Sequence, residues 1–64
     1  MSQHLMKKAI EAALNAFRRK MDSFTIYGVT MRIAHAHDNQ YQVLLPGDVE
    51  FVRLIAGEKI QVLV

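Results

Sequence analysis

The sequence predicts an α+β fold, in which one N-terminal helix precedes a five-stranded, strongly bent antiparallel sheet. Over roughly the first twenty residues, apolar side chains recur every three or four positions, which is the period of an amphipathic helix. From Phe24 onward, short runs rich in β-branched and aromatic residues alternate between apolar and polar, which is typical of strands. The breaks between these runs are too short for parallel crossovers. We therefore expect neighbouring strands to be antiparallel and to bend into a small barrel.

The predicted helix begins after Ser2, whose hydroxyl makes it a good N-cap residue, and extends to about Met21. No glycine or proline interrupts this segment, and its four alanines raise the helix propensity. The apolar positions with helical spacing are Leu5, Met6, Ile10, Ala13, Leu14, Phe17 and Met21. The single domain is thus divided into a helical segment, residues 1–22, and a five-stranded small barrel, residues 24–64.

Five short strands are expected after the helix, at residues 24–29, 30–37, 40–45, 49–55 and 58–64. Gly28 in the first of these indicates a bulge or bend. Asp38-Asn39 is a turn signal because both side chains tolerate positive φ and bond locally to the backbone. The later turns are expected at residues 46–48 and 56–57. The last strand carries the apolar run IQVLV, and an apolar edge with few charges usually pairs with another chain.

The size of the chain and its lack of cysteine bound its chemistry. A domain of 64 residues is near the lower limit for an unaided hydrophobic core. Without cysteine, it can form neither disulfides nor thiolate metal sites. No apolar run resembles a signal peptide or reaches membrane-spanning length. We therefore expect a cytoplasmic homo-oligomer that has no membrane segment, cofactor or metal ion.

Positive charge is concentrated in the helical segment. Residues 1–20 have a balance of +4 and residues 21–64 a balance of −2. Arg18, Arg19 and Lys20 are consecutive at the predicted helix end. Such cations bind phosphates and release counterions, which makes a polyanion the natural partner. Alternatively, they stabilise the helix end by meeting its dipole and capping its carbonyls.

Other candidate residues also have structural alternatives. His35 and His37 have a spacing that suits two metal ligands, but two exposed histidines explain the pattern better. In Gln40-Tyr41-Gln42, the ring and amides suit base stacking and base reading, but Tyr41 facing the core is the favoured interpretation, because alternation alone explains the pattern. The chain has no G-x-S-x-G motif or phosphate-binding loop, so we do not expect an enzyme.

Three segments resemble the Sm-like family, and in particular its bacterial branch, the Hfq-like RNA chaperones. LNAFRRK, residues 14–20, is similar to the end of the family's helix. TIY, residues 25–27, is similar to the start of its first strand, and NQYQVLL, residues 39–45, to the start of its third. The resemblance covers most of the chain in order.

The resemblance and the charge pattern together imply eight RNA-binding residues: Arg18, Arg19, Lys20, Tyr27, Arg32, Gln40, Tyr41 and Lys59. The two arginines match the family's rim arginines. Gln40 and Tyr41 match the pair that binds uridine on the face bearing the helices. Tyr27, with Met31 and Arg32, matches the purine site on the opposite face, and Lys59 partly replaces the family's lysine-histidine pair.

We therefore expect a homo-oligomeric ring of about five to seven subunits, in which strand four of one subunit pairs with strand five of the next. The ring would bind single-stranded, A/U-rich RNA as a chaperone or post-transcriptional regulator, because it gathers the cations of all subunits. One alternative is a small DNA-associated regulator of the antitoxin or phage repressor type. Another is a phage or plasmid protein-interaction module that pairs through its last strand. A structural oligomer without a ligand is a third.

Overall fold

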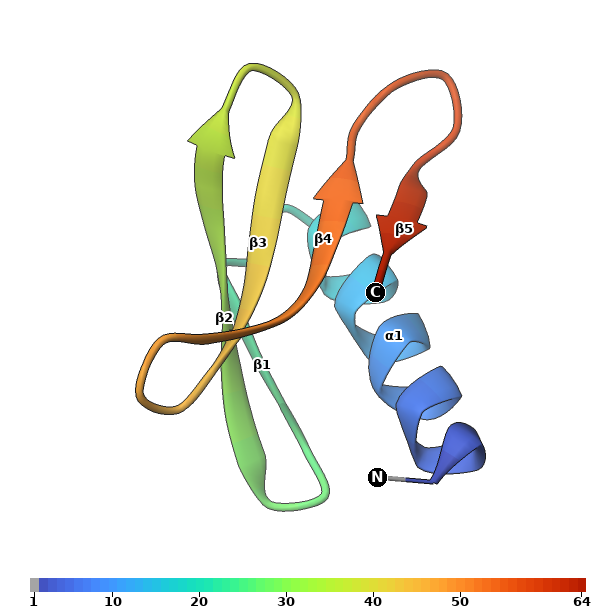
Figure 1. The fold of residues 1–64 in the computed structure, drawn as a ribbon, viewed down its shortest axis with the longest axis vertical. Helices are drawn as coiled ribbons and strands as arrows, with labels where there is room; N and C mark the ends of the chain where they lie inside the picture. Colours follow the sequence, from blue (N-terminus) through green and yellow to red (C-terminus); the bar gives the residue numbers. More distant parts are fainter. Residues whose placement is uncertain (1) are drawn as a thin grey trace.

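A computed structural model of the protein describes residues 2–64 and contains one helix followed by five strands (Figure 1). The elements are α1 Gln3–Arg18, β1 Ser23–Ile26, β2 Val29–His37, β3 Gln40–Leu45, β4 Val49–Ile55 and β5 Gln61–Leu63. Each strand pairs antiparallel with the next, in the order β1-β2-β3-β4-β5. The predicted α+β class and five-stranded antiparallel sheet are confirmed. Over residues 2–64, no helix has the length and apolar character needed to cross a membrane.

The start of α1 agrees with the prediction. Ser2 has an extended backbone, with φ −70° and ψ 158°, and its Oγ accepts a hydrogen bond from the Leu5 N–H at 3.2 Å. This bond satisfies one of the amide groups that a helix leaves free at its N-terminus.

The end of α1 comes earlier than predicted, at Arg18 instead of about Met21. Lys20 adopts a left-handed backbone conformation, with φ 59°. Its N–H donates to the Phe17 carbonyl at 3.0 Å, and the Met21 N–H donates to the Ala16 carbonyl at 2.9 Å. These two bonds form a Schellman motif, in which the backbone itself satisfies the terminal carbonyls of the helix.

One face of α1 packs against one face of the sheet. The buried cluster between them consists of Ala9, Ala13, Met31, Val43, Val52 and Leu54. The helix therefore contributes only alanines to this cluster, and the larger side chains come from β2, β3 and β4. Ile10, Leu14 and Phe17 of α1 are partly buried and pack around this cluster.

The first predicted strand is too long. β1 ends at Ile26, and Tyr27 and Gly28 form a two-residue turn with φ 52° and φ 73°. Two positive φ values are typical of the tight turns that match the twist of a hairpin. Gly28 therefore belongs to a turn and not to a bulge inside a strand, and Tyr27 is a turn residue. The predicted turn at Asp38 is confirmed, with φ 49°.

The last strand is shorter than predicted, and its partner lies in the same chain. Residues 61–63 of β5 pair with residues 53–55 of β4, whereas the sequence predicts pairing with β4 of another copy. β1 and β5 are the two edges of an open sheet. Within the part of the chain that is described, the outer edge of β5 has no strand partner, and β5 does not cover residues 49–52 of β4. A β4–β5 ladder between copies can therefore use only the outer edge of β5 and residues 49–52 of β4.

Candidate functional site

An open groove lies where the end of α1 meets β2 and β3. Its volume is about 520 Å³. The lining residues, which we call the aromatic groove, are Phe17, Arg18, Lys20, Met21, Asp22, Ile33, His35 and Tyr41. Five of the eight come from the helix end and the connection to β1, so the Schellman turn determines much of the shape of the groove.

Three rings lie in contact along the groove. The Tyr41 ring meets Phe17 edge to face, with 4.8 Å between the ring centroids and 61° between the planes. On β2, the His35 imidazole lies 4.9 Å from the Tyr41 centroid at 33°. Phe17 and Tyr41 also pack against the buried cluster. The Tyr41 ring therefore packs on the core, as the structural interpretation predicts, and it also lines the groove.

His35 is held by the turn that follows β2. Its Nε2 lies 2.7 Å from the Asp38 carbonyl oxygen. Because a carbonyl oxygen only accepts, this hydrogen bond requires a proton on Nε2. The positive φ of Asp38 is part of the turn that presents this carbonyl. Within residues 2–64, no group of three or more histidines, cysteines and carboxylates is placed to hold a metal ion.

The three consecutive cations are all exposed. Arg18 and Lys20 line the groove, and Arg19 is the C-cap residue between them. Among residues 2–64, their side chains make no hydrogen bond or ion pair. The backbone already satisfies the last carbonyls of α1, so side-chain capping does not explain the cluster. An interaction with the helix dipole, at about 0.3–1 kcal/mol per charge, leaves the cations available to an anion.

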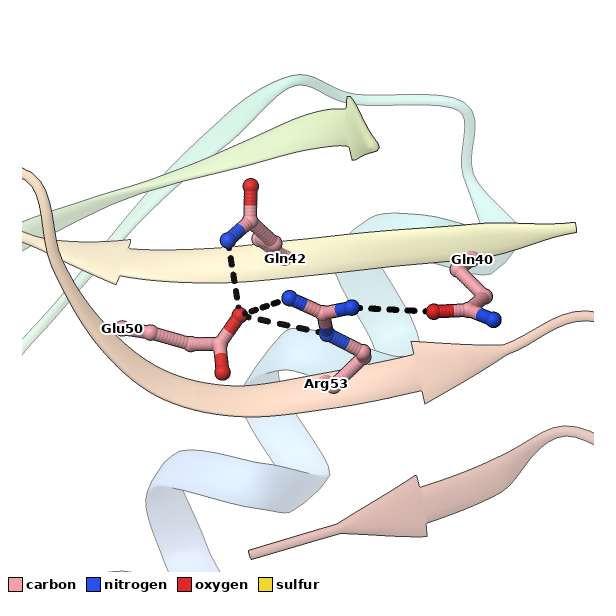
Figure 2. Close-up of polar contacts among 4 residues, drawn as sticks. All are labelled: Gln40, Gln42, Glu50 and Arg53. Atoms are coloured by element: carbon pink, nitrogen blue, oxygen red, sulfur yellow. Dashed lines mark hydrogen bonds and ion pairs between the residues drawn. The ribbon is translucent and has the colours of Figure 1, made fainter. Parts of the chain in front are cut away.

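Gln40 does not join Tyr41 in the groove, which corrects the predicted uridine pair. Adjacent strand residues point to opposite faces of a sheet. On the other face, the Gln40 Oε1 accepts from Arg53 Nη1 at 2.9 Å. Arg53 Nε and Nη2 donate to Glu50 Oε1 at 3.2 and 2.8 Å, and Gln42 Nε2 donates to the same oxygen at 2.7 Å (Figure 2). We call these four residues the amide network.

The amide network depends on an irregularity in β4. Glu50 and Arg53 are three positions apart, and in a regular strand they would point to opposite faces. The register shifts between Val43 and Leu44, so that Val43 pairs with Val52 while Leu44 pairs with Glu50. This irregularity returns Glu50 to the face of Arg53. The hydrogen bond from Arg53, followed by that from Gln42, lowers the pKa of the Glu50 carboxyl.

The predicted purine site is not assembled within the chain. Met31 is 1% exposed and belongs to the core, which excludes it from any contact with RNA. Tyr27 is 61% exposed in the β1–β2 turn. Arg32 pairs with Ser23 at the end of the β1–β2 ladder that is distant from this turn. At about 3.3 Å per residue, Arg32 is roughly 10 Å from Val29, where the turn ends. Its Nη2 donates to Asp48 Oδ1 at 2.5 Å.

Lys59 lies in the connection between β4 and β5, away from the groove. It lines a second hollow of about 370 Å³ together with Asn39 and Gln61. In Figure 1, this connection and the β1–β2 turn are at opposite ends of the molecule.

Of the eight predicted RNA-binding residues, the structure thus brings together Arg18, Lys20 and Tyr41 at the groove, with Arg19 adjacent in sequence.

Sequence reasoning missed several parts of the site. The helical spacing of Phe17 predicts a core position, and Asp22 belongs to no motif. The pattern at His35 predicts an exposed or rim histidine and gives no sign of a contact with Tyr41. A usable signal was the position of His35 on the same predicted strand face as Ile33, which makes it a neighbour of Tyr41 once β2 and β3 pair, as His35 and Tyr41 do.

No protein-family model, curated protein or solved structure matches this chain. The chemistry of the site comes from its own groups. Three contacting rings can stack on a flat ligand, and two cations at the groove can bind an anion. A ligand that carries both an aromatic ring and a phosphate satisfies both parts.

Proposed function

We propose that this chain is a divergent Sm-like protein that binds single-stranded RNA at the aromatic groove. The observation that carries the proposal is the contact of Phe17, Tyr41 and His35 beside Arg18 and Lys20. The bases of a single strand are free to stack on such rings, at about 1–3 kcal/mol per base. The phosphates then lie within reach of the cations, whose charge makes the affinity dependent on salt.

The geometry favours a single strand over duplex DNA. Bases in a duplex are stacked on each other, so the rings of the groove have no base face to contact. A helix that docks on duplex DNA reads it with an exposed face. On α1 and its C-cap, the cations outside the groove are Lys7, Lys8 and Arg19. The Nζ of Lys8 lies 4.0 Å from Glu11 Oε2. The positive charge is instead concentrated at the helix end beside the rings.

We further propose that copies of the chain join head to tail into a ring. The outer edge of β5 would pair with residues 49–52 of β4 in the next copy. The apolar side chains near these edges are exposed, at 57% for Val49, 52% for Leu63 and 86% for Val64. Head-to-tail contacts close into rings when the rotation between copies permits. A ring of about five to seven copies would multiply the weak affinity of each groove.

Binding is tested by fluorescence anisotropy with labelled U-rich RNA, A-rich RNA and duplex DNA of equal length. We expect the single strands to bind more tightly than the duplex, with an affinity that falls steeply with salt concentration. The A/U preference is a prediction from the family resemblance, and a G/C-containing single strand tests it. Equal or tighter binding to the duplex would contradict the proposal.

A double variant, Arg18→Ala with Arg19→Ala, tests the cation cluster. It should weaken RNA binding and reduce the salt dependence, because fewer phosphates are neutralised. The matched control is Lys7→Ala with Lys8→Ala, which removes the same charge from the first half of α1. If both double variants lose affinity equally, net charge and not the groove determines binding.

A further inference from the structure

We infer that the aromatic groove selects guanine among the bases of a bound single strand, through hydrogen-bond acceptors supplied by Asp22 and His35. The inference rests on the proposed function, because it concerns the base that enters the same groove. It differs from the A/U preference that the family resemblance implies, and it comes from groups that the resemblance does not assign.

The first acceptor is the Nδ1 atom of His35. The bond from Nε2 to the Asp38 carbonyl requires the proton on Nε2. In a neutral imidazole, Nδ1 then has no proton and can only accept. Within residues 2–64, Nδ1 makes no hydrogen bond, whereas the ring is held in place by Tyr41 and by the turn. The groove thus contains a fixed ring with an unused acceptor.

The second acceptor is the carboxylate of Asp22. Asp22 lines the groove, and its backbone is fixed because its carbonyl accepts from the Ile33 N–H at 2.8 Å. In the described part of the chain, the carboxylate makes no hydrogen bond or ion pair. An ionised carboxylate accepts at two oxygens and donates at neither.

Guanine is the base that complements this set. Its N1–H and one N2–H are adjacent donors on one edge, so they can form paired bonds to the two oxygens of the Asp22 carboxylate. The second N2–H is then left for His35 Nδ1. Its O6 and N7 are acceptors that suit Arg18 or Lys20. Uracil presents a single N3–H between two carbonyl oxygens, which a carboxylate repels. Adenine and cytosine each place a ring acceptor beside their amino group, so neither offers two adjacent donors.

The preference is tested with the RNA hexamers UUUUUU, UUGUUG and UUIUUI, in which inosine lacks the 2-amino group. Anisotropy is measured near pH 8 at one salt concentration. A bidentate pair of hydrogen bonds favours the matching base over another base by roughly tenfold in affinity. We therefore expect UUGUUG to bind about tenfold more tightly than UUUUUU. The inosine hexamer should lose most of this advantage, because it removes one of the paired donors.

Two variants test the residues. Asp22→Ala should lose most of the preference for UUGUUG over UUUUUU, without weakening the binding of UUUUUU. His35→Phe keeps a ring against Tyr41 but removes the acceptor, so it should narrow the guanine preference. Glu58→Ala is the matched control, since it removes one exposed carboxylate outside the groove and should keep the full preference. Circular dichroism establishes that each variant is folded.

The outcomes separate the inference from the proposed function. Equal binding of the uridine and guanosine hexamers by the unmodified protein would overturn the inference and leave RNA binding intact. A guanine preference that is unchanged in Asp22→Ala would overturn the role of Asp22, and one that is unchanged in His35→Phe would overturn that of His35. If none of the hexamers binds, the proposed function itself fails.

Discussion

Tyr41 connects the stability of the protein with its proposed binding site. Its ring contacts Phe17 on the helix and His35 on β2, and it also packs on the buried cluster. The hydroxyl, in contrast, makes no hydrogen bond within residues 2–64. The ring and the hydroxyl can therefore be tested separately.

Tyr41→Ala is expected to lower the free energy of unfolding by about 2 kcal/mol, because it removes a half-buried ring and two aromatic contacts. It should also weaken RNA binding. Tyr41→Phe keeps the ring and should preserve both properties. Urea unfolding and anisotropy measure the two effects. A large loss in Tyr41→Phe would contradict this account.

Glu50 is the residue whose titration should affect folding. Its pKa is lowered in the folded state, chiefly by the hydrogen bond from Arg53. The folded protein therefore binds a proton less readily than the unfolded chain does. The stabilisation is present above the ordinary pKa of a glutamate and is lost as the pH falls through the lowered value.

Glu50→Gln should remove this contribution. We expect the free energy of unfolding of the variant to depend less on pH in the acid range than that of the unmodified protein. The effect is small because Glu50 is exposed. Urea unfolding at a series of acid pH values measures it, and Glu58→Gln is the control. Parallel pH profiles for Glu50→Gln and the unmodified protein would show that the amide network does not contribute to the pH dependence of stability.

At the level of the secondary-structure elements, the end of α1 places a strained backbone and a groove-lining cation at the same residue, Lys20. Lys20 holds a left-handed conformation that glycine adopts without strain. In return, the Schellman turn keeps a cation at the groove. Stability and binding therefore make opposite demands on this position.

Lys20→Gly should raise the free energy of unfolding by about 1 kcal/mol, because glycine relieves the left-handed strain. The same substitution should weaken RNA binding, since it removes a cation. Lys20→Asn is a useful companion, because asparagine tolerates positive φ better than lysine and also lacks the charge. Thermal unfolding and anisotropy measure the two effects. A Lys20→Gly variant that is less stable would contradict the assignment of strain.

The elements differ in how well the sequence predicts them. β3 and β4 have the predicted bounds, residues 40–45 and 49–55, because clear turn residues flank them. The end of α1 was misplaced because lysine at the left-handed position gives no signal, unlike glycine. The amide network depends on a register shift, which local residue patterns do not encode. The groove required the pairing of β2 with β3 and the docking of α1, and both are tertiary contacts.

At the scale of the whole molecule, β1 and β5 are the two edges of an open sheet. The exposed apolar residues Val49, Leu63 and Val64 lie near the edge formed by β4 and β5. An edge of this kind pairs readily with a second copy, and charged residues usually prevent such pairing. The proposed assembly therefore depends on a few side chains that can be changed without altering the core.

Leu63→Lys is expected to shift the protein from an oligomer toward a monomer, because a charge on the edge strand opposes strand pairing. Affinity for long single-stranded RNA should fall with it, while binding of a hexamer is largely kept. Light scattering gives the mass. Leu5→Lys, an apolar-to-charged change on the exposed part of α1, is the control. A monomeric unmodified protein would remove the ring from the proposal.

The way in which α1 docks has a consequence for dynamics. Its buried residues are the small ones, Ala9, Ala13 and Ala16, whereas its larger apolar side chains that pack on the core, Ile10, Leu14 and Phe17, are only partly buried. Local unfolding begins where buried apolar contacts are few, and the amides of α1 should exchange with deuterium sooner than those of β3. Undocking α1 also dismantles the proposed binding site, because Phe17 and Arg18 leave with it. Bound RNA should therefore slow deuterium uptake along the helix.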